Sequence, residues 1–211
     1  MSDFYTDEQR ALQEQFSTRA LADRLTELTV HATFTDDDIA FIASRDFFFL
    51  ATTDAGGNPT VSYKGGRTGF VSIADNRLIF PCYDGNGMFL SMGNVKATAK
   101  VGLLFIDFQV PKRLRVQGRA RLEASSEPGN LATVVIEPTS IFVNCPRYIH
   151  RYARVEEAKH APGEDGSAPL AQWKRLDAVY DALPDADRKA VDEVGTVGFE
   201  EAMAKFERGE G

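Results

Sequence analysis

The sequence predicts a mainly β fold with flanking helices, an α+β arrangement whose strands form an antiparallel barrel. Between Phe47 and Val143, about six or seven short runs rich in β-branched and aromatic residues follow one another, separated by turns that contain glycine or asparagine. Most connections between these runs have hairpin length, and no regular alternation of strand and helix occurs, which favours a barrel over a parallel sheet. Apolar residues at helical spacing precede and follow this region.

The first 34 residues are expected to form a helical arm. Between Thr6 and Leu28, leucine and phenylalanine recur at helical spacing in a polar, charged background. Thr35 then stands before three aspartates, which combines an N-cap hydroxyl with the negative charge that a helix N-terminus prefers. A short helix should follow and end near Asp46.

The strands and turns of the barrel are expected in a fixed order. The predicted strands are Phe47 to Thr53, Thr60 to Lys64, Phe70 to Ile73, Leu78 to Tyr83, Val101 to Phe108, Leu114 to Leu122 and Thr133 to Val143. A glycine-rich loop from Asp84 to Gly87 should lead into a short helix from Met88 to Val95.

The last part of the chain is expected to be helical. A loop rich in glycine, proline and acidic residues, His160 to Pro169, precedes predicted helices from Leu170 to Leu183 and from Asp185 to Arg208. The predicted organisation is therefore an arm over residues 1–34, a barrel domain over 35–150, and a linker with helices over 151–211 that pack on the same domain.

Composition excludes several classes of protein. The chain has 24 lysines and arginines against 31 acidic residues, a net charge of −7 that repels nucleic acid unless cations gather in one patch. No apolar run approaches the roughly 20 residues that a membrane-spanning helix needs. Nothing near the N-terminus combines a basic start with an apolar run, so we expect a cytoplasmic protein with no membrane and no nucleic-acid partner.

One predicted strand carries a row of cations. Alternation places five polar residues on one face and apolar residues on the other. The polar residues are Arg113, Arg115, Gln117, Arg119 and Arg121. A solvated sheet face or intersubunit salt bridges would explain this row, and so would an anion site.

Two glycine-containing segments are candidate binding loops. In the segment from Ser62 to Arg67, Gly65 and Gly66 allow close backbone approach, while Lys64 and Arg67 offer donors to a phosphate or a carbonyl. A bent hairpin with ordinary surface cations is the alternative. Asn86 and Gly87 precede the short helix, where backbone amides could face an anion, although a plain turn explains them equally well.

The segment Asn144 to His150 contains a cysteine and a histidine. Cys145 and His150 do not have the spacing of zinc ligands, so we expect no metal site. Cys145 is expected to be a small buried residue at the end of a strand, and a reactive thiol near Arg147 is the alternative. No motif of a hydrolase occurs, which leaves cofactor chemistry as the enzyme class that the sequence favours.

Seven short motifs, in this order and spacing, resemble the pyridoxamine 5′-phosphate oxidase-like FMN-binding family. They are Phe49-Leu50-Ala51-Thr52, Gly57-Asn58-Pro59, Ser62-Tyr63-Lys64-Gly65-Gly66, Gly69-Phe70-Val71, Tyr83-Asp84-Gly85-Asn86-Gly87, Val101-Gly102-Leu103-Leu104-Phe105 and Gly118-Arg119-Ala120. The likeness covers roughly residues 35 to 150, and the segment Asn144 to His150 resembles an uncharacterised bacterial branch. It implies a split β-barrel homodimer that holds FMN between its subunits.

The resemblance also implies a set of cofactor-binding residues. The strand from Ser62 to Arg67 would lie along the flavin, Pro81 and Cys82 would flank it, and Arg113 would contact it. A Ser-Arg-Lys run that holds phosphate in the oxidase is replaced here by Met88-Phe89-Leu90 followed by Ser91. Arg67 is the expected phosphate partner, and Arg113, Arg115 or the helix N-terminal amides after Asn86 are the alternatives. The expected set is Ser62, Tyr63, Lys64, Gly65, Arg67, Pro81, Cys82, Asn86, Gly87, Ser91, Arg113 and Arg115.

The function that these motifs imply is flavin chemistry on a small molecule that the sequence does not identify. We expect an FMN-dependent oxidoreductase and assign no catalytic side chain, because the flavin itself carries hydride or electrons. A flavin- or haem-binding carrier or sensor without turnover is the alternative. A third hypothesis is a barrel that dimerises as an interaction protein without a cofactor.

Overall fold

The computed structural model describes residues 4–163 and 165–209, which divide into two compact units. The first unit ends at Glu156 and the second begins at Glu157. Residues 1–3 of the predicted arm, Glu164 of the predicted loop and residues 210–211 lie outside the described part. Among the described residues, no helix is long and apolar enough to cross a membrane.

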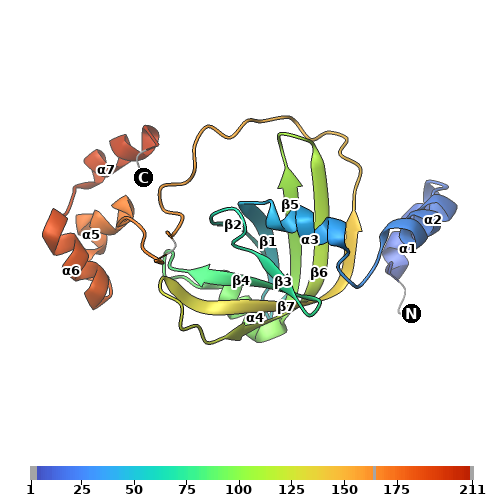
Figure 1. Ribbon diagram of the computed structural model, residues 1–211, viewed down its shortest axis with the longest axis horizontal. Coiled ribbons are helices and arrows are strands. Elements are labelled where there is room, and N and C mark those ends of the chain that lie inside the picture. The colour runs from blue at the N-terminus through green and yellow to red at the C-terminus, as the bar shows by residue number, and fades with distance from the viewer. Residues whose placement is uncertain (1–3, 164, 210–211) are drawn as a thin grey trace. The chain divides into compact units, whose positions relative to one another are not determined.

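One antiparallel sheet of seven strands forms the centre of the first unit (Figure 1). The strands are β1 (Phe47–Thr53), β2 (Pro59–Gly65), β3 (Ser72–Ala74), β4 (Arg77–Tyr83), β5 (Lys100–Asp107), β6 (Lys112–Glu123) and β7 (Asn130–Val143). Their order in the sheet is β2-β1-β5-β6-β7-β4-β3. The sheet curves without closing, so that β2 and β3 are its two edges. The predicted mainly β fold of the split-barrel type, with flanking helices, is confirmed.

Strand β6 shows why this sequence forms a curved, two-faced sheet. Leu114, Val116 and Ala120 are buried, whereas Arg115 and Arg119 are exposed, so the predicted alternation is confirmed. The register of β6 against β7 shifts between Gln117 and Gly118, as in a β-bulge. Bulges bend a strand and increase its twist, which lets a long strand serve both halves of a curved sheet.

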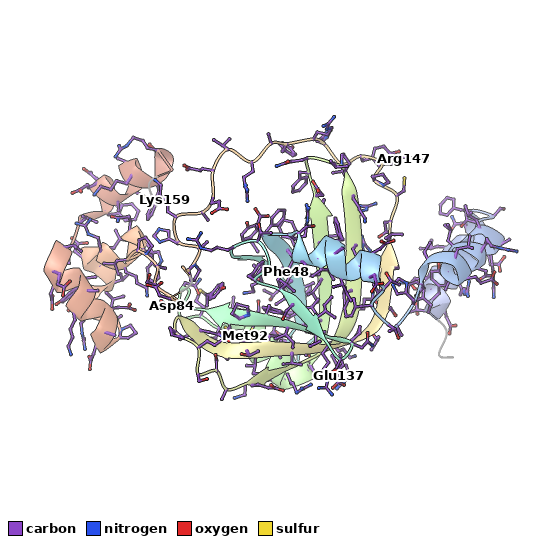
Figure 2. All side chains as sticks on the ribbon, in the orientation of Figure 1. Phe48, Asp84, Met92, Glu137, Arg147 and Lys159 are labelled. Carbon is purple, nitrogen blue, oxygen red and sulfur yellow. The ribbon has the colours of Figure 1, made fainter. Side chains whose placement is uncertain are left out.

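Aromatic side chains fill the inside of the curved sheet. Phe48, labelled in Figure 2, is fully buried and lies with its ring centroid 5.0 Å from that of Phe80 and 5.1 Å from that of Phe105. Phe70 stacks on Phe48 at 5.9 Å. Because β1, β4 and β5 each contribute a ring, this cluster joins strands that are distant in the order of the sheet.

In the described part of the first unit, four helices accompany the sheet: α1 (Asp7–Gln15), α2 (Arg19–Thr29), α3 (Asp36–Ala43) and α4 (Leu90–Thr98). The hydroxyl of Thr35 accepts a hydrogen bond from the backbone of Asp38, and the Asp38 carboxylate accepts one from the backbone of Thr35 at 2.9 Å. This capping box lies at the start of α3 and confirms that Thr35 is its N-cap, as predicted. The helical arm expected between Thr6 and Leu28 is the pair α1 and α2.

Two predicted boundaries differ in the first unit. The helix expected from Met88 begins at Leu90 because Phe89 adopts a left-handed conformation with φ of 49°. The strand expected over Phe70 to Ile73 begins at Ser72 instead. Its first residues form a turn in which the Phe70 amide donates to the Arg67 carbonyl at 3.0 Å, with Gly69 at φ of 87°.

The second unit is helical and contains η1 (Gln172–Arg175), α5 (Asp177–Tyr180), α6 (Asp185–Val194) and α7 (Phe199–Glu207). The prediction of one helix over Asp185 to Arg208 is wrong. Gly195, with φ of 78°, ends α6, and a new helix begins only at Phe199. Lys174 is buried in this unit, and its ammonium donates to both oxygens of Asp187 at 2.9 Å.

Candidate functional site

The inner face of β2 presents two polar side chains to the interior of the curved sheet. Ser62 pairs with Leu50 and Lys64 pairs with Phe48 in the register of β2 against β1. Both partners on β1 are fully buried. Directly paired residues of an antiparallel ladder project to the same side, so Ser62 and Lys64 face the core while Val61 and Tyr63 face outward.

Helix α4 adds a third polar group to this place. The hydroxyls of Ser62 and Ser91 lie 3.0 Å apart, and Ser91 is buried on the first turn of α4. The same helix is attached to β1 further along, where the buried Asn94 amide donates to the Thr52 hydroxyl at 3.0 Å. These two polar contacts fix α4 against the edge of the sheet that carries Ser62.

Strand β4 brings Cys82 to the same interior. Burial lowers the pKa of the Lys64 ammonium, and the neighbouring Cys82 acts in the opposite direction. Burial likewise raises the pKa of the Cys82 thiol, and the charge of Lys64 offsets part of that rise. The backbone amide of Cys82 donates to the Asn130 side chain at 3.0 Å, at the point where the register of β4 against β7 shifts.

Lys64 is the group in this cluster that lacks a partner. It is half-buried, and its ammonium makes no hydrogen bond or ion pair with any residue of the described chain. A half-buried cation is costly unless an anion or acceptor meets it. We call the group formed by Ser62, Lys64, Cys82 and Ser91 the inner cluster. It is rich in hydrogen-bond donors and therefore suits a ligand that is rich in acceptors.

Other residues of the expected set lie in loops or on the opposite face. Arg67, Asn86 and Gly87 are exposed in loops, and Asn86 accepts a hydrogen bond from the Met88 amide at 3.1 Å. Pro81 precedes Cys82 in β4, so its side chain projects to the other face of that strand. The structure thus brings together four of the twelve expected residues.

Glycines 65 and 66 give room to aromatic rings of the same chain. A Cβ atom on Gly65 would lie 2.6 Å from a ring carbon of Tyr63, and one on Gly66 would lie 2.6 Å from a ring carbon of Phe70. On the side where a Cβ would project, the space next to these two glycines is therefore filled by the rings of Tyr63 and Phe70. A ligand was expected to approach the backbone there.

Arg113, Arg115 and Tyr63 lie on the outer face of the sheet. The register connects Tyr63 with Phe49, Phe49 with Leu104, and Leu104 with Arg115 in one row across four strands. Adjacent strands are about 4.8 Å apart, so Tyr63 and Arg115 stand about 14 Å apart along this row. Within one chain, the sheet itself separates these side chains from the inner cluster.

A row of stacked aromatic rings on the outer face was missed by sequence reasoning. Tyr63 stacks on Phe47 with 5.3 Å between ring centroids, Phe47 stacks on Phe108 at 6.0 Å, and Tyr152 meets Phe108 edge to face at 5.5 Å. Burial raises the pKa of Tyr63, with a smaller contribution from the charge of Asp46. The signal was available, since Phe47 and Phe49 occupy the outward positions of a strand whose inward positions are also apolar.

Cys145 is exposed, so the expectation of a buried cysteine is wrong. The last pair in the ladder between β6 and β7 is Leu114 with Val143, and the chain leaves the sheet before Cys145. Its sulfur accepts a hydrogen bond from the Arg147 amide at 3.4 Å, and Figure 2 shows Arg147 in the segment that follows β7. His150 is exposed in the same segment.

Comparison with known proteins connects this geometry to a family. The family model described as pyridoxamine 5′-phosphate oxidase matches residues 34–140. Among curated proteins, none matches the sequence.

Several solved structures are similar to part of the chain. HupZ of Group A Streptococcus is 17% identical over 57% of this chain and 100% of its own, with a TM-score of 0.44. HutZ, the heme storage protein of Vibrio cholerae, is 15% identical over 53% of this chain and 94% of its own, with a TM-score of 0.41. An FMN-binding protein of Syntrophomonas wolfei is 13% identical over 64% of this chain and 97% of its own, with a TM-score of 0.41.

The matched segment of the family model begins at Phe34, just before α3, and ends at Ser140 in β7, so it contains the whole inner cluster. Because this segment spans just over half of the 211 residues, the chain belongs to the pyridoxamine 5′-phosphate oxidase family.

Proposed function

We propose that this protein binds FMN at the inner cluster and uses it as an oxidoreductase on a small molecule. The observation that carries the proposal is the half-buried Lys64, which has no partner among the described residues and lies beside Ser62 and Cys82 in the segment that the family model matches. A bound flavin would supply hydride transfer, which no side chain of this cluster can perform.

The residues present fit an acceptor-rich group. The Lys64 ammonium is a donor, and whichever of the Ser62 and Ser91 hydroxyls accepts in their mutual contact can turn its own proton toward a ligand. Lys64 would neutralise developing negative charge on the ligand, and the apolar core behind it would exclude water. Arg67, exposed in the loop after β2, is our choice for the phosphate partner, because guanidinium binds phosphate with two parallel hydrogen bonds.

A homodimer would bring together the expected site residues that lie on opposite faces of the sheet within one chain. Arg113 and Arg115 cannot reach the inner cluster of their own chain through the sheet, but a second copy could bring them to it. The outer face at the edge strand β2, on the same side of the sheet as these arginines, is also suited to contact, because Val61 is 68% exposed and Tyr63, in the aromatic row, is 61% exposed. We propose that FMN lies between two copies and that each site takes its arginines from the partner.

The protein is proposed to act in the cytoplasm. Cys82 and Cys145 are both free thiols, which suits a reducing compartment. No nucleic-acid partner is proposed, because the chain carries a net charge of −7.

An absorption spectrum of the purified protein, followed by titration with FMN, tests the proposal. Flavin bands that weaken in Arg67→Ala would support it, and a colourless protein that binds no FMN would overturn it. Reduction by a nicotinamide cofactor and reoxidation in air would favour the oxidoreductase. Bound flavin without either reaction would favour the carrier or sensor. A Soret band would show that the protein binds haem and not flavin.

A further inference from the structure

The end of β4 that carries Cys82 has one neighbouring strand in the described sheet. On one side, β3 pairs only with the first residues of β4, from Arg77 to Ile79. From Phe80 onward, the register connects β4 with β7 alone. Pro81 lies in this part of the strand and has no amide hydrogen to donate. The position of Cys82 therefore depends on how this end of β4 is bonded to β7.

The pairing of β4 with β7 is irregular at this point. Cys82 pairs with Ala132. The next pair is Tyr83 with Asn130, so the register passes over Leu131. The Asn130 side chain bridges the irregularity. Its Oδ1 atom accepts hydrogen bonds from the backbone amides of Cys82 at 3.0 Å and of Ala132 at 3.2 Å.

The carboxamide of Asn130 uses all of its hydrogen-bonding capacity. Its Nδ2 atom donates to the hydroxyl of Ser125 at 2.9 Å and to that of Thr133 at 3.3 Å. A carboxamide has two N–H donors and an oxygen with two lone pairs, and all four are matched here. Both bonds to the oxygen come from backbone N–H groups, which fixes the orientation of the amide. One side chain thus connects β4, β7 and the segment between β6 and β7.

We propose that Asn130 is a positioning residue of the inner cluster. By accepting the hydrogen bond of the Cys82 amide, it holds the Cys82 side chain close to Lys64. It also fixes the start of the loop, residues 84–89, that leads from β4 to α4 and Ser91. The consequence for FMN affinity rests on the proposed function, whereas the hold on Cys82 does not.

Loss of this acceptor should release the end of β4. A backbone N–H group that lacks an acceptor away from water is unfavourable, so the strand end would move toward solvent to find one. Cys82 is half-buried in the parent protein and would then become more exposed. The exposure of this thiol is therefore a direct measure of what Asn130 does.

Alkylation of Cys82 tests the hold in the full chain without any ligand. In a Cys145→Ser background, Cys82 is the remaining cysteine of the sequence. We expect iodoacetamide to react several-fold faster with Asn130→Ala than with the parent. Thr133→Val is the matched control, because it removes another bond of the same carboxamide and leaves the Cys82 amide its acceptor. It should react at close to the parent rate.

Asn130→Asp separates the acceptor oxygen from the rest of the carboxamide. Its carboxylate can still accept from both backbone amides, and the hydroxyls of Ser125 and Thr133 can turn to donate to it. Cys82 should therefore react no faster than in the parent. Where Asn130→Ala does not fold, Asn130→Ser takes its place in the comparison, because its hydroxyl is one bond shorter than the side chain it replaces.

Equal alkylation rates for Asn130→Ala and Thr133→Val, in protein whose circular dichroism matches the parent, would overturn the proposal. FMN titration of the same samples reads out the site. We expect Asn130→Ala to bind FMN several-fold more weakly than Thr133→Val, and equal affinities would overturn the positioning role. A parent protein that binds no FMN would reject the proposed function, and the alkylation rates alone would then decide whether Asn130 holds Cys82.

Discussion

The Ser62 hydroxyl on β2 lies 3.0 Å from the buried Ser91 hydroxyl on α4. This contact joins the edge strand of the sheet to the one helix that follows β4 in the matched segment. It places two polar groups beside Lys64 and so completes the inner cluster.

The Ser62–Ser91 contact is expected to be energetically coupled. Ser62→Ala and Ser91→Ala should each lower the free energy of unfolding by about 1 kcal/mol, because each removes one hydrogen bond and leaves its partner unsatisfied. The double variant should lose clearly less than the sum of the two. Urea unfolding of the four proteins measures the coupling, and strict additivity would show that the hydroxyls do not bind each other.

Lys64 is expected to bind the ligand. Lys64→Met removes the ammonium but keeps the length of the side chain, and it should weaken FMN binding by about tenfold or more, the effect of losing one charge-assisted hydrogen bond. Burial lowers the pKa of this ammonium, so the same variant should unfold no more easily than the parent. The matched control is Lys96→Met on the exposed side of α4, which should bind FMN as the parent does. Similar losses in both variants would contradict a specific role.

Asp38 is expected to make the stability depend on pH. Burial alone would raise its pKa, but hydrogen bonds from Thr35 and from His31, whose Nε2 lies 2.8 Å away, lower it below the ordinary aspartate value. Folding thus favours the carboxylate, so its contribution is present above the ordinary pKa and is lost as the pH falls through the lower folded value.

Asp38→Asn should therefore unfold more easily by about 1 kcal/mol at neutral pH, and the difference should vanish in acid. Asp37→Asn, exposed in the same helical turn, should change the free energy of unfolding by only a few tenths of that amount. Thermal unfolding across the acid range measures both. A difference that stays constant with pH would mean that the charge of Asp38 is not what stabilises α3.

Gly118 is expected to be indispensable at the bulge of β6. A Cβ atom there would lie 2.5 Å from the Glu137 carbonyl oxygen, a backbone atom that cannot easily move. Gly118→Ala should cost about 2 to 4 kcal/mol of folding free energy. Gly102→Ala is the control, because its Cβ atom would meet only the Cβ of Ala51 at 3.9 Å. Comparable midpoints in denaturant for the two variants would refute this role of the bulge.

Much of the fold could be predicted from local sequence patterns. The strict alternation in β6 predicted its two faces, and Thr35 and Asp38 predicted the start of α3. Both predictions succeeded because the residues that determine these features are close in the chain. The starts of α4 and β3 were placed wrongly for the opposite reason. Phe89 adopts a left-handed conformation that its own propensity disfavours, and the turn that ends at Gly69 was signalled only by a glycine, which tolerates positive φ but also occurs within strands.

The site could be predicted only in part, because it depends on register between distant strands. Alternation alone would have shown that Ser62 and Lys64 share a face, but which face is the inner one follows from their pairing with Leu50 and Phe48. The nearness of Lys64 to Cys82 requires β4 to fold across from β2, and nothing in either segment contains that information. The separation of Arg115 from Lys64 by the sheet has the same origin.

The FMN site that we propose combines Lys64 of one copy with Arg115 of the other. A heterodimer that combines one Lys64→Met copy with one Arg115→Gln copy, purified through two different tags, tests whether the site is shared. In this heterodimer one of the two sites keeps both residues and the other loses both. At an FMN concentration a few times the parent's dissociation constant, we predict about half of the parent's FMN per heterodimer and clearly less than that per variant homodimer. A heterodimer that binds no more than the variant homodimers would contradict a shared site, and a parent protein that binds no FMN would contradict FMN binding at the inner cluster.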